Sequence, residues 1–274
     1  MLRILDVLWL IMFLSVANAQ GWTREDSFQA ASPGTPERVF TNASTIWVTT
    51  GNEDALLSKN GGHSWERVSI LTAKGGIVAV YFVSPRRGWA VGNKGNLACI
   101  LGTKDGGRTW KEEIVVNRLR NGVFADVRFF DENTGIAVGG IEANDHSKHL
   151  VSMTRDGGNT WSTVFIDSPF NSPLRCVRFR TRDEIFAVGG ETVLSTSNGG
   201  VAWRTYNPPK AYILNGVGFT GQKIFVTGGW GMLLESVDAG RTWRTASLPP
   251  GSERFFFGPW FLWATAAGFP VTKA

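Results

Sequence analysis

One octapeptide pattern occurs five times in the chain and constrains its fold more than any other feature. The copies are SKNGGHSW (58–65), TKDGGRTW (103–110), TRDGGNTW (154–161), TSNGGVAW (196–203) and SVDAGRTW (236–243). Their tryptophans are separated by 45, 51, 42 and 40 residues. A nearly constant period of this length indicates one structural unit repeated along the chain.

Each octapeptide follows two apolar segments joined by a polar turn. Examples are VRFFDENTGIAVGG (127–140), VRFRTRDEIFAVGG (177–190) and VGFTGQKIFVTGG (217–229). With the strands on either side of the octapeptide, one unit contains four short strands. Four-stranded sheets repeated about an axis form the blades of a β-propeller, in which each sheet covers the faces of its neighbours.

The last unit lacks its octapeptide. The segment RFFFGPWFLWATAAGFPVTKA (254–274) supplies three strands, and QGWTRED (20–26) resembles the missing fourth. We therefore expect an all-β, six-bladed propeller whose last blade is closed by the N-terminal strand, with seven blades as the alternative. Gly258, Pro259, Gly268 and Pro270 favour strands over a membrane helix in the apolar stretch 255–271.

The first residues have the pattern of a secretory signal. A basic start and an apolar run from Leu5 to Val16 precede Ala17-Asn18-Ala19, a small-residue cleavage site. We expect a signal peptide over 1–19 and a single propeller domain over 20–274. An uncleaved membrane anchor is the alternative. The expected location is the periplasm, the thylakoid lumen or the extracellular space.

Cysteine and histidine usage indicates neither a metal site nor a cofactor. Cys99 and Cys176 fall in non-adjacent units, so buried free thiols are expected, with a disulfide as the alternative. His146 and His149 beside Asp145 are a weak metal pattern, and a solvated insertion explains them better. The net charge of +5 favours acidic partners but is too small to indicate nucleic-acid binding.

The octapeptides resemble the Asp-box, or BNR repeat, of sialidases and related propellers. The fuller unit, GWAVGNKG (88–95) with TKDGGRTW, is similar to the photosystem II assembly and stability factor family. In these families the box joins the third and fourth strands of a blade, on the face opposite the binding site. That family is usually described with seven blades, whereas the repeats of this chain indicate six. This difference leaves open that the protein has a different client.

The box residues are expected to be structural. The third position accepts hydrogen bonds from turn amides, the fifth supplies a glycine with positive φ, and the tryptophan begins the outer strand and packs between strands. The residues at the third position and the tryptophans are Asn60, Asp105, Asp156, Asn198 and Asp238, with Trp65, Trp110, Trp161, Trp203 and Trp243.

The opposite face is rich in arginine. The resemblance implies an arginine patch that holds an acidic or C-terminal segment of a membrane-protein client, with Arg175 as the closest match. The candidates, some in the expected loop 113–122, are Arg118, Arg120, Arg128, Arg175, Arg178, Lys210 and Arg254. The alternative is that these are ordinary surface charges paired with Glu112, Glu113 or Asp126.

We therefore expect a non-catalytic, monomeric, exported scaffold that binds a protein client, which in a photosynthetic host is a photosystem II protein. The alternative is a carbohydrate-binding or divergent sialidase-like glycosidase propeller. The F/Y-R-I-P segment of sialidases is absent, and no tyrosine has an assignable glutamate partner. Glu142 and Asp145, in the expected loop 139–149, and Glu191 are the carboxylate candidates for glycoside hydrolysis.

Overall fold

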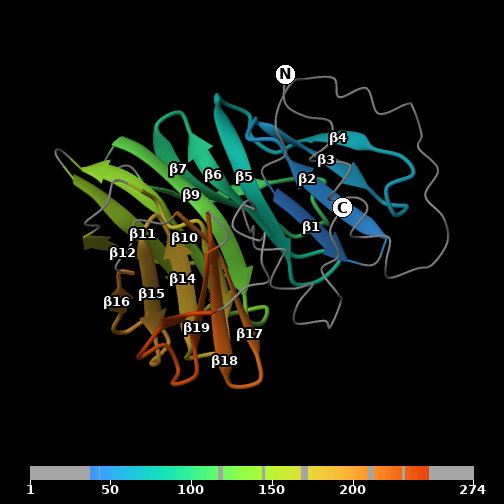
Figure 1. Ribbon diagram of the computed structural model, residues 1–274. Coiled ribbons are helices and arrows are strands. Elements are labelled where there is room, and N and C mark those ends of the chain that lie inside the picture. Colours follow the sequence, from blue (N-terminus) through green and yellow to red (C-terminus); the bar gives the residue numbers. More distant parts are fainter. Residues whose placement is uncertain are drawn as a thin grey trace.

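The computed structural model describes residues 38–42, 44–116, 120–143, 146–167, 172–208, 213–229 and 232–246. They form five four-stranded antiparallel sheets, in each of which strands adjacent in sequence are also paired (Figure 1). The first strands of successive sheets contact one another in turn, β1 with β5, β5 with β9, β9 with β13 and β13 with β17. They are therefore the inner strands of consecutive propeller blades.

The blades follow chain order. The first contains β1 (Arg38–Asn42), β2 (Thr45–Thr49), β3 (Asp54–Ser58) and β4 (Glu66–Ser69). The second contains β5 (Gly75–Phe82), β6 (Gly88–Lys94), β7 (Leu97–Thr103) and β8 (Lys111–Val116). The third contains β9 (Arg120–Phe129), β10 (Gly135–Ala143), β11 (His146–Thr154) and β12 (Ser162–Asp167). The fourth contains β13 (Cys176–Phe179), β14 (Ile185–Gly189), β15 (Thr192–Thr196) and β16 (Arg204–Tyr206). The fifth contains β17 (Leu214–Thr220), β18 (Lys223–Gly228), β19 (Leu233–Ser236) and β20 (Arg244–Thr245).

The hydrophobic core is divided among the spaces between blades. Four clusters of buried side chains fill the four interfaces between the five described blades. In the first interface, for example, Trp47 stacks on Phe82 with ring centroids 5.3 Å apart. Each sheet is therefore covered by its neighbours, as expected from the repeat.

The propeller fold and its four-stranded blades are confirmed. The expected closure of a sixth blade by 20–26 and 254–274, and hence the blade count, lies outside the described residues, as does the signal peptide over 1–19. Within the described part of the chain, no helix has the length and apolar character needed to span a membrane.

Both cysteines are buried free thiols, as expected. Cys99 lies in β7 of the second blade and Cys176 in β13 of the fourth. Burial raises the pKa of the Cys99 thiol to about 12. A thiol this hard to ionise is unreactive, so Cys99 serves packing.

Each octapeptide is a turn closed by its own side chains. The first-position hydroxyl accepts the N–H of the fifth-position glycine in all five copies, at 2.8–3.0 Å. Oδ1 of the third residue accepts the N–H of the seventh at 2.9 Å, again in all five. The turn joins the third and fourth strands of its blade, and the outer strand starts one residue after the tryptophan. We call the end of the propeller that carries these turns the box face.

The fifth-position glycine has a second role, which is contact with the preceding blade. A Cβ on Gly107 would lie 2.6 Å from the ring of Trp47, and one on Gly158 would lie 2.6 Å from Nε1 of Trp89. In the next two blades the atoms in the way belong to Met153 and Phe186. The box therefore fixes the spacing of neighbouring blades as well as its own hairpin.

The opposite end, which we call the loop face, is joined by backbone hydrogen bonds between blades. Leu174 N–H donates to Gly139 O at 3.1 Å, and Leu214 N–H donates to Gly190 O at 2.7 Å. Each bond joins the segment that enters one blade to the second-strand end of the blade before it. The two ends of each interface are thus held by different means, a box turn at one and main-chain bonds at the other.

Replacing Gly158 with alanine should destabilise the protein by at least about 2 kcal/mol more than replacing Gly95. Both residues have positive φ, +85° and +59°, but nothing lies within 4 Å of a Cβ on Gly95. The control therefore carries the backbone strain alone, about 1 kcal/mol. Urea unfolding of both variants measures the difference, and equal losses would show that contact between blades is unimportant.

The box aspartates should support stability against acid. A hydroxyl donor, Thr109, Thr160 or Thr242, is the largest cause that lowers the pKa of Asp105, Asp156 and Asp238 from 3.8 to about 2. A depressed folded-state pKa gives stability that is present above about pH 4 and lost as the pH falls toward 2.

The triple variant D105N/D156N/D238N removes this titration but keeps the turns, because Asn60 and Asn198 already occupy the same position. Unfolding followed from pH 6 to pH 2 should show a shallower loss of stability below pH 4 than in the unmodified protein. An unchanged slope would exclude the box carboxylates as its source.

Candidate functional site

Three of the arginine-patch candidates have described side chains, and the structure brings two of these together. Asp126 in β9 is completely buried and forms ion pairs with Arg128, at 3.3 Å, and with Arg178 of the neighbouring blade, at 3.0 Å. Its Oδ2 also accepts the N–H of Val177 at 3.0 Å. One carboxylate thus joins the inner strands of the third and fourth blades and orders two guanidinium groups.

These two guanidinium groups remain partly exposed. Their side chains keep 19% and 28% of their accessible surface, whereas Asp126 keeps none. Arg128 also lies over the ring of Tyr81, with 5.3 Å between its Cζ and the ring centroid. The cluster carries two positive charges and one negative charge, so it presents a net positive charge on the inner strands.

Arg175 lies beside this cluster in the chain but not on the strand. β13 begins at Cys176, so Arg175 comes directly before the strand that carries Arg178. The N–H of Arg175 donates to Val188 O at 2.7 Å, which fixes the backbone, and the side chain is exposed. Arg175 therefore presents its charge from an ordered segment at the loop face.

The other candidates have no described side chain. Arg118, Lys210 and Arg254 lie outside the described residues. Arg120 is the first residue of β9, opposite Glu142, so it belongs to a strand and not to the expected loop 113–122. That loop is shorter than expected because β8 continues to Val116.

The expected loop 139–149 is mostly strand. β10 continues to Ala143 and β11 begins at His146, so a long hairpin takes the place of a solvated insertion. His149 is buried, and neither of its ring nitrogens has a hydrogen-bond partner. Burial lowers the pKa of His149 to about 4, so the ring is neutral near neutral pH. No group of three potential metal-binding side chains occurs among the described residues.

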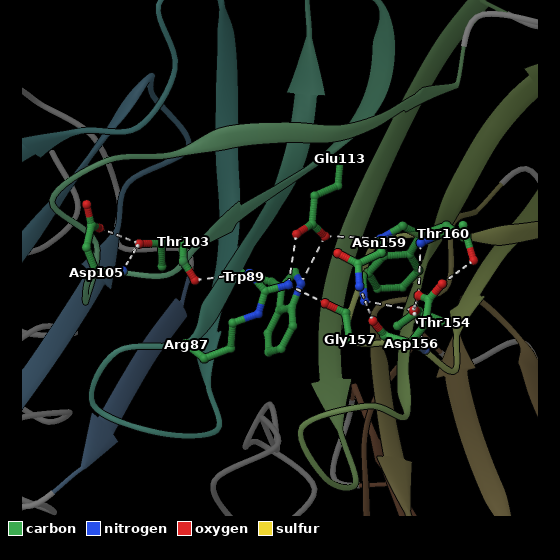
Figure 2. A network of polar contacts seen from close by, with 12 residues as sticks. Arg87, Trp89, Thr103, Asp105, Glu113, Thr154, Asp156, Gly157, Asn159 and Thr160 are labelled. Carbon is green, nitrogen blue, oxygen red and sulfur yellow. Dashed lines mark hydrogen bonds and ion pairs between the residues drawn. The ribbon is translucent and has the colours of Figure 1, made fainter.

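A second carboxylate, which is half-buried, joins the second and third blades near the box face. Oε2 of Glu113 accepts the indole N–H of Trp89 at 2.9 Å and that of Trp161 at 3.1 Å (Figure 2). Its Oε1 pairs with Arg87 at 3.2 Å. Arg87 in turn donates to the carbonyl of Gly157, in the box of the third blade. The box tryptophan Trp161 is thereby tied to the blade before its own.

Burial raises the pKa of Glu113, although three donors favour its charged form. The first of these donors in strength is Trp161, and Arg87 and Trp89 add to it. Because the donors come from both blades, the carboxylate acts as a cross-link between them. Its environment is closed by indole rings, with Arg87 stacked 4.5 Å from the centroid of Trp89. The carboxylate is thus used in contacts between and within the blades.

Sequence reasoning missed this cross-link. Glu113 appeared only as a partner for surface charges, and its position in an outer strand gave no sign of burial. The tryptophan in GWAVG was the available signal, because a buried indole N–H needs an acceptor. The acceptor comes from another strand of the same sheet, a pairing that the repeat pattern does not define.

The glycosidase carboxylates expected from the sequence are not assembled by the described residues. Asp145 lies outside them, and nothing is described of the Glu142 side chain. Glu191 is partly exposed in the turn between β14 and β15. A pair with the spacing that glycoside hydrolysis requires is therefore not defined by this part of the chain.

Comparison with protein families agrees with the repeat pattern. A family described as photosynthesis system II assembly factor YCF48 matches residues 159–253. The comparison with curated proteins gave no match. The chain is therefore an Asp-box β-propeller that resembles photosystem II assembly factors.

Solved structures show the same fold in two kinds of protein. A structure titled "YCF48 bound to D1 peptide" matches with a TM-score of 0.60 and 18% identity, over 88% of this chain and 78% of that one. YCF48 from Cyanidioschyzon merolae matches with a TM-score of 0.55 and 20% identity, over 79% and 73%. An ancestral GH74 enzyme matches with a TM-score of 0.65 and 17% identity, over 82% of this chain but 33% of the enzyme. The chain thus spans about a third of that enzyme.

Replacing Glu113 with glutamine should destabilise the protein by about 2 kcal/mol, because an amide cannot accept both indole N–H groups and also pair with Arg87. The neighbouring variant E112Q is the matched control. Glu112 pairs with Lys94 at the surface, so its loss should cost less than about 1 kcal/mol. Urea unfolding followed by tryptophan fluorescence measures both, and equal effects would contradict the cross-link.

Proposed function

We propose that this protein is a non-catalytic scaffold that binds an acidic or C-terminal peptide segment of a protein client through arginines at its inner strands and loop face. The observation that carries the proposal is the pair Arg128 and Arg178, held by one buried Asp126 with their outer edges partly exposed. Guanidinium groups fixed in this way are suited to carboxylates, which they bind with two parallel hydrogen bonds.

Asp126 has two effects in this proposal. It balances part of the positive charge, so the guanidinium groups are stable in a half-buried place. It also orients them before a client arrives, which lowers the entropy lost on binding. Arg175, exposed directly before the inner strand that carries Arg178, adds a positive charge for a carboxylate that approaches from the loop face.

The comparisons support this proposal over others. The family that matches the fourth and fifth blades is described by an assembly function, and one similar structure contains a D1 peptide. In a photosynthetic host, the client would be a photosystem II protein. We further propose that the protein is exported and works as a monomer in the periplasm, the thylakoid lumen or the extracellular space.

A carbohydrate-active propeller is the second candidate. It is favoured by the likeness to GH74 enzymes, among them one from Niastella koreensis with a TM-score of 0.59 and 17% identity over 77% of this chain and 37% of that one. The two functions make different demands on the same face. A glycosidase needs two carboxylates at a defined separation, whereas a peptide scaffold needs positive charge.

Binding of a fluorescent peptide with an acidic C-terminus tests the proposal. The unmodified protein should bind it, the variant R175E should bind at least tenfold more weakly, and the effect should weaken as salt is added. R204E is the control, since Arg204 is an exposed residue of the same blade but lies next to its box turn. Equal affinity for R175E and the unmodified protein would reject the arginine site. Hydrolysis of any of a panel of β-glucans and sialosides would reject the non-catalytic function.

A further inference from the structure

Unpaired positive charge is concentrated in one corner of the box face. Arg86 lies in the turn between β5 and β6, and Lys104 and Arg108 lie in the box of the same blade. All three are exposed, and none forms an ion pair or a side-chain hydrogen bond with the described residues. We call these three residues the basic corner.

The two turns of the basic corner are in contact, so its charges share one surface. The N–H of Gly106 donates to the carbonyl of Arg86 at 2.9 Å. A Cβ on Gly106 would lie 2.8 Å from the carbonyl oxygen of Pro85. The positive charges are therefore carried by adjoining turns of defined geometry, and not by a loose tail.

Nearby carboxylates are already occupied. Asp105 accepts hydrogen bonds from Thr109 and Thr103 within its own box. Glu112 pairs with Lys94, and Glu113 with Arg87. Lys111, just after the box tryptophan, is a further exposed cation with no ion-pair partner in the described part of the chain. Hydrogen bonds leave the negative charge of Asp105 in place, so three cations and one carboxylate give the corner a net positive charge.

In the other described blades, several cations near the box face have a partner. Lys59 of the first box pairs with Glu66 at 2.6 Å, and Lys223 of the fifth blade pairs with Glu235 at 2.7 Å. In the third and fourth blades, Arg182 pairs with Asp131, and Arg155 donates to Gly199 O at 2.7 Å. Arg241 of the fifth box is likewise exposed and has no partner among the described residues, but it is a single cation. The second blade is distinguished by three such cations on two adjoining turns.

The placement of the charges indicates what kind of partner fits. The three exposed side chains stand on turns, and none of them lines the hollow between the boxes of the fourth and fifth blades, which is lined by Phe186, Asn198, Arg204 and Gly240 among others. A peptide binds in a groove or along a strand edge, whereas long cationic side chains on turns can meet a broad anionic surface.

We propose that the basic corner docks the propeller on an anionic lipid surface. The long side chains reach the phosphate groups of several lipids while the box turns stay folded, and no apolar insertion is required. In the peptide site proposed above, Arg175 lies at the loop face, at the other end of the blades. Arg128 and Arg178 lie on the inner strands of the third and fourth blades, not on the turns of the second. This inference does not depend on the client proposal.

Cosedimentation with lipid vesicles tests this inference. The protein as purified after export should bind vesicles of equal parts phosphatidylglycerol and phosphatidylcholine more strongly than vesicles of phosphatidylcholine alone. Each cation near such a surface contributes roughly fivefold to partitioning. The variant R86Q/K104Q/R108Q should therefore lose at least tenfold in anionic binding, and about 0.5 M salt should abolish it.

The variant K74Q/R204Q/R241Q is the matched control, because it removes three exposed and unpaired cations from other places. It should bind within about threefold of the unmodified protein, and so should R175E. Equal loss in both triple variants would assign the effect to net charge and overturn the proposal. The proposal would also be overturned if the protein showed no preference for anionic vesicles. The same holds if a polyglutamate peptide bound at the corner and vesicles did not.

Discussion

The contact between a box glycine and the preceding blade is the constraint on which the rest of the structure depends. Gly107 meets Trp47 and Gly158 meets Trp89, at distances that no Cβ would permit. The box hydrogen bonds set each glycine in its positive-φ conformation, and the large ring of the neighbour then closes over it. One small turn therefore shapes the hairpin of its own blade and sets its contact with the preceding blade.

Two carboxylates also join neighbouring blades, through polar contacts. Glu113 joins the second and third blades near the box face through two indoles and Arg87, and Asp126 joins the inner strands of the third and fourth through two arginines. They differ in net charge. Glu113 is balanced by one arginine and two neutral indole groups. Asp126 pairs with two arginines, which leaves a net positive charge, and this is why binding is proposed at that cluster.

The likeness to two kinds of solved propeller has a physical explanation. Blades pack through glycine contacts, aromatic rings and strand pairing, and none of these requires a particular residue at the loop face. A peptide-binding protein and a glycoside hydrolase can therefore share the fold at identities of 17–18%. In this chain the arginines that the structure fixes most clearly are Arg128 and Arg178, which lie on the inner strands.

The repeat determined most of the fold without a structure. Five octapeptides of constant pattern predicted four-stranded blades, because the turn chemistry of Ser or Thr, Asp or Asn, and Gly is local and the sequence shows all of it. The same locality explains the misplaced details. The expected loops 113–122 and 139–149 are shorter, since β8, β10 and β11 continue into residues whose polar character resembled that of a loop.

What only the tertiary structure decided concerns partners from different strands and blades. Arg128 and Arg178 were candidates from the sequence. That they share the carboxylate of Asp126 follows from two inner strands lying side by side. Glu113 was also considered from the sequence, but the indole groups that bind it come from β6 and from the third box. The box hydrogen bonds join residues that are at most four positions apart, so the sequence predicts them. Burial and charge pairing depend on the distance between strands, which the sequence does not give.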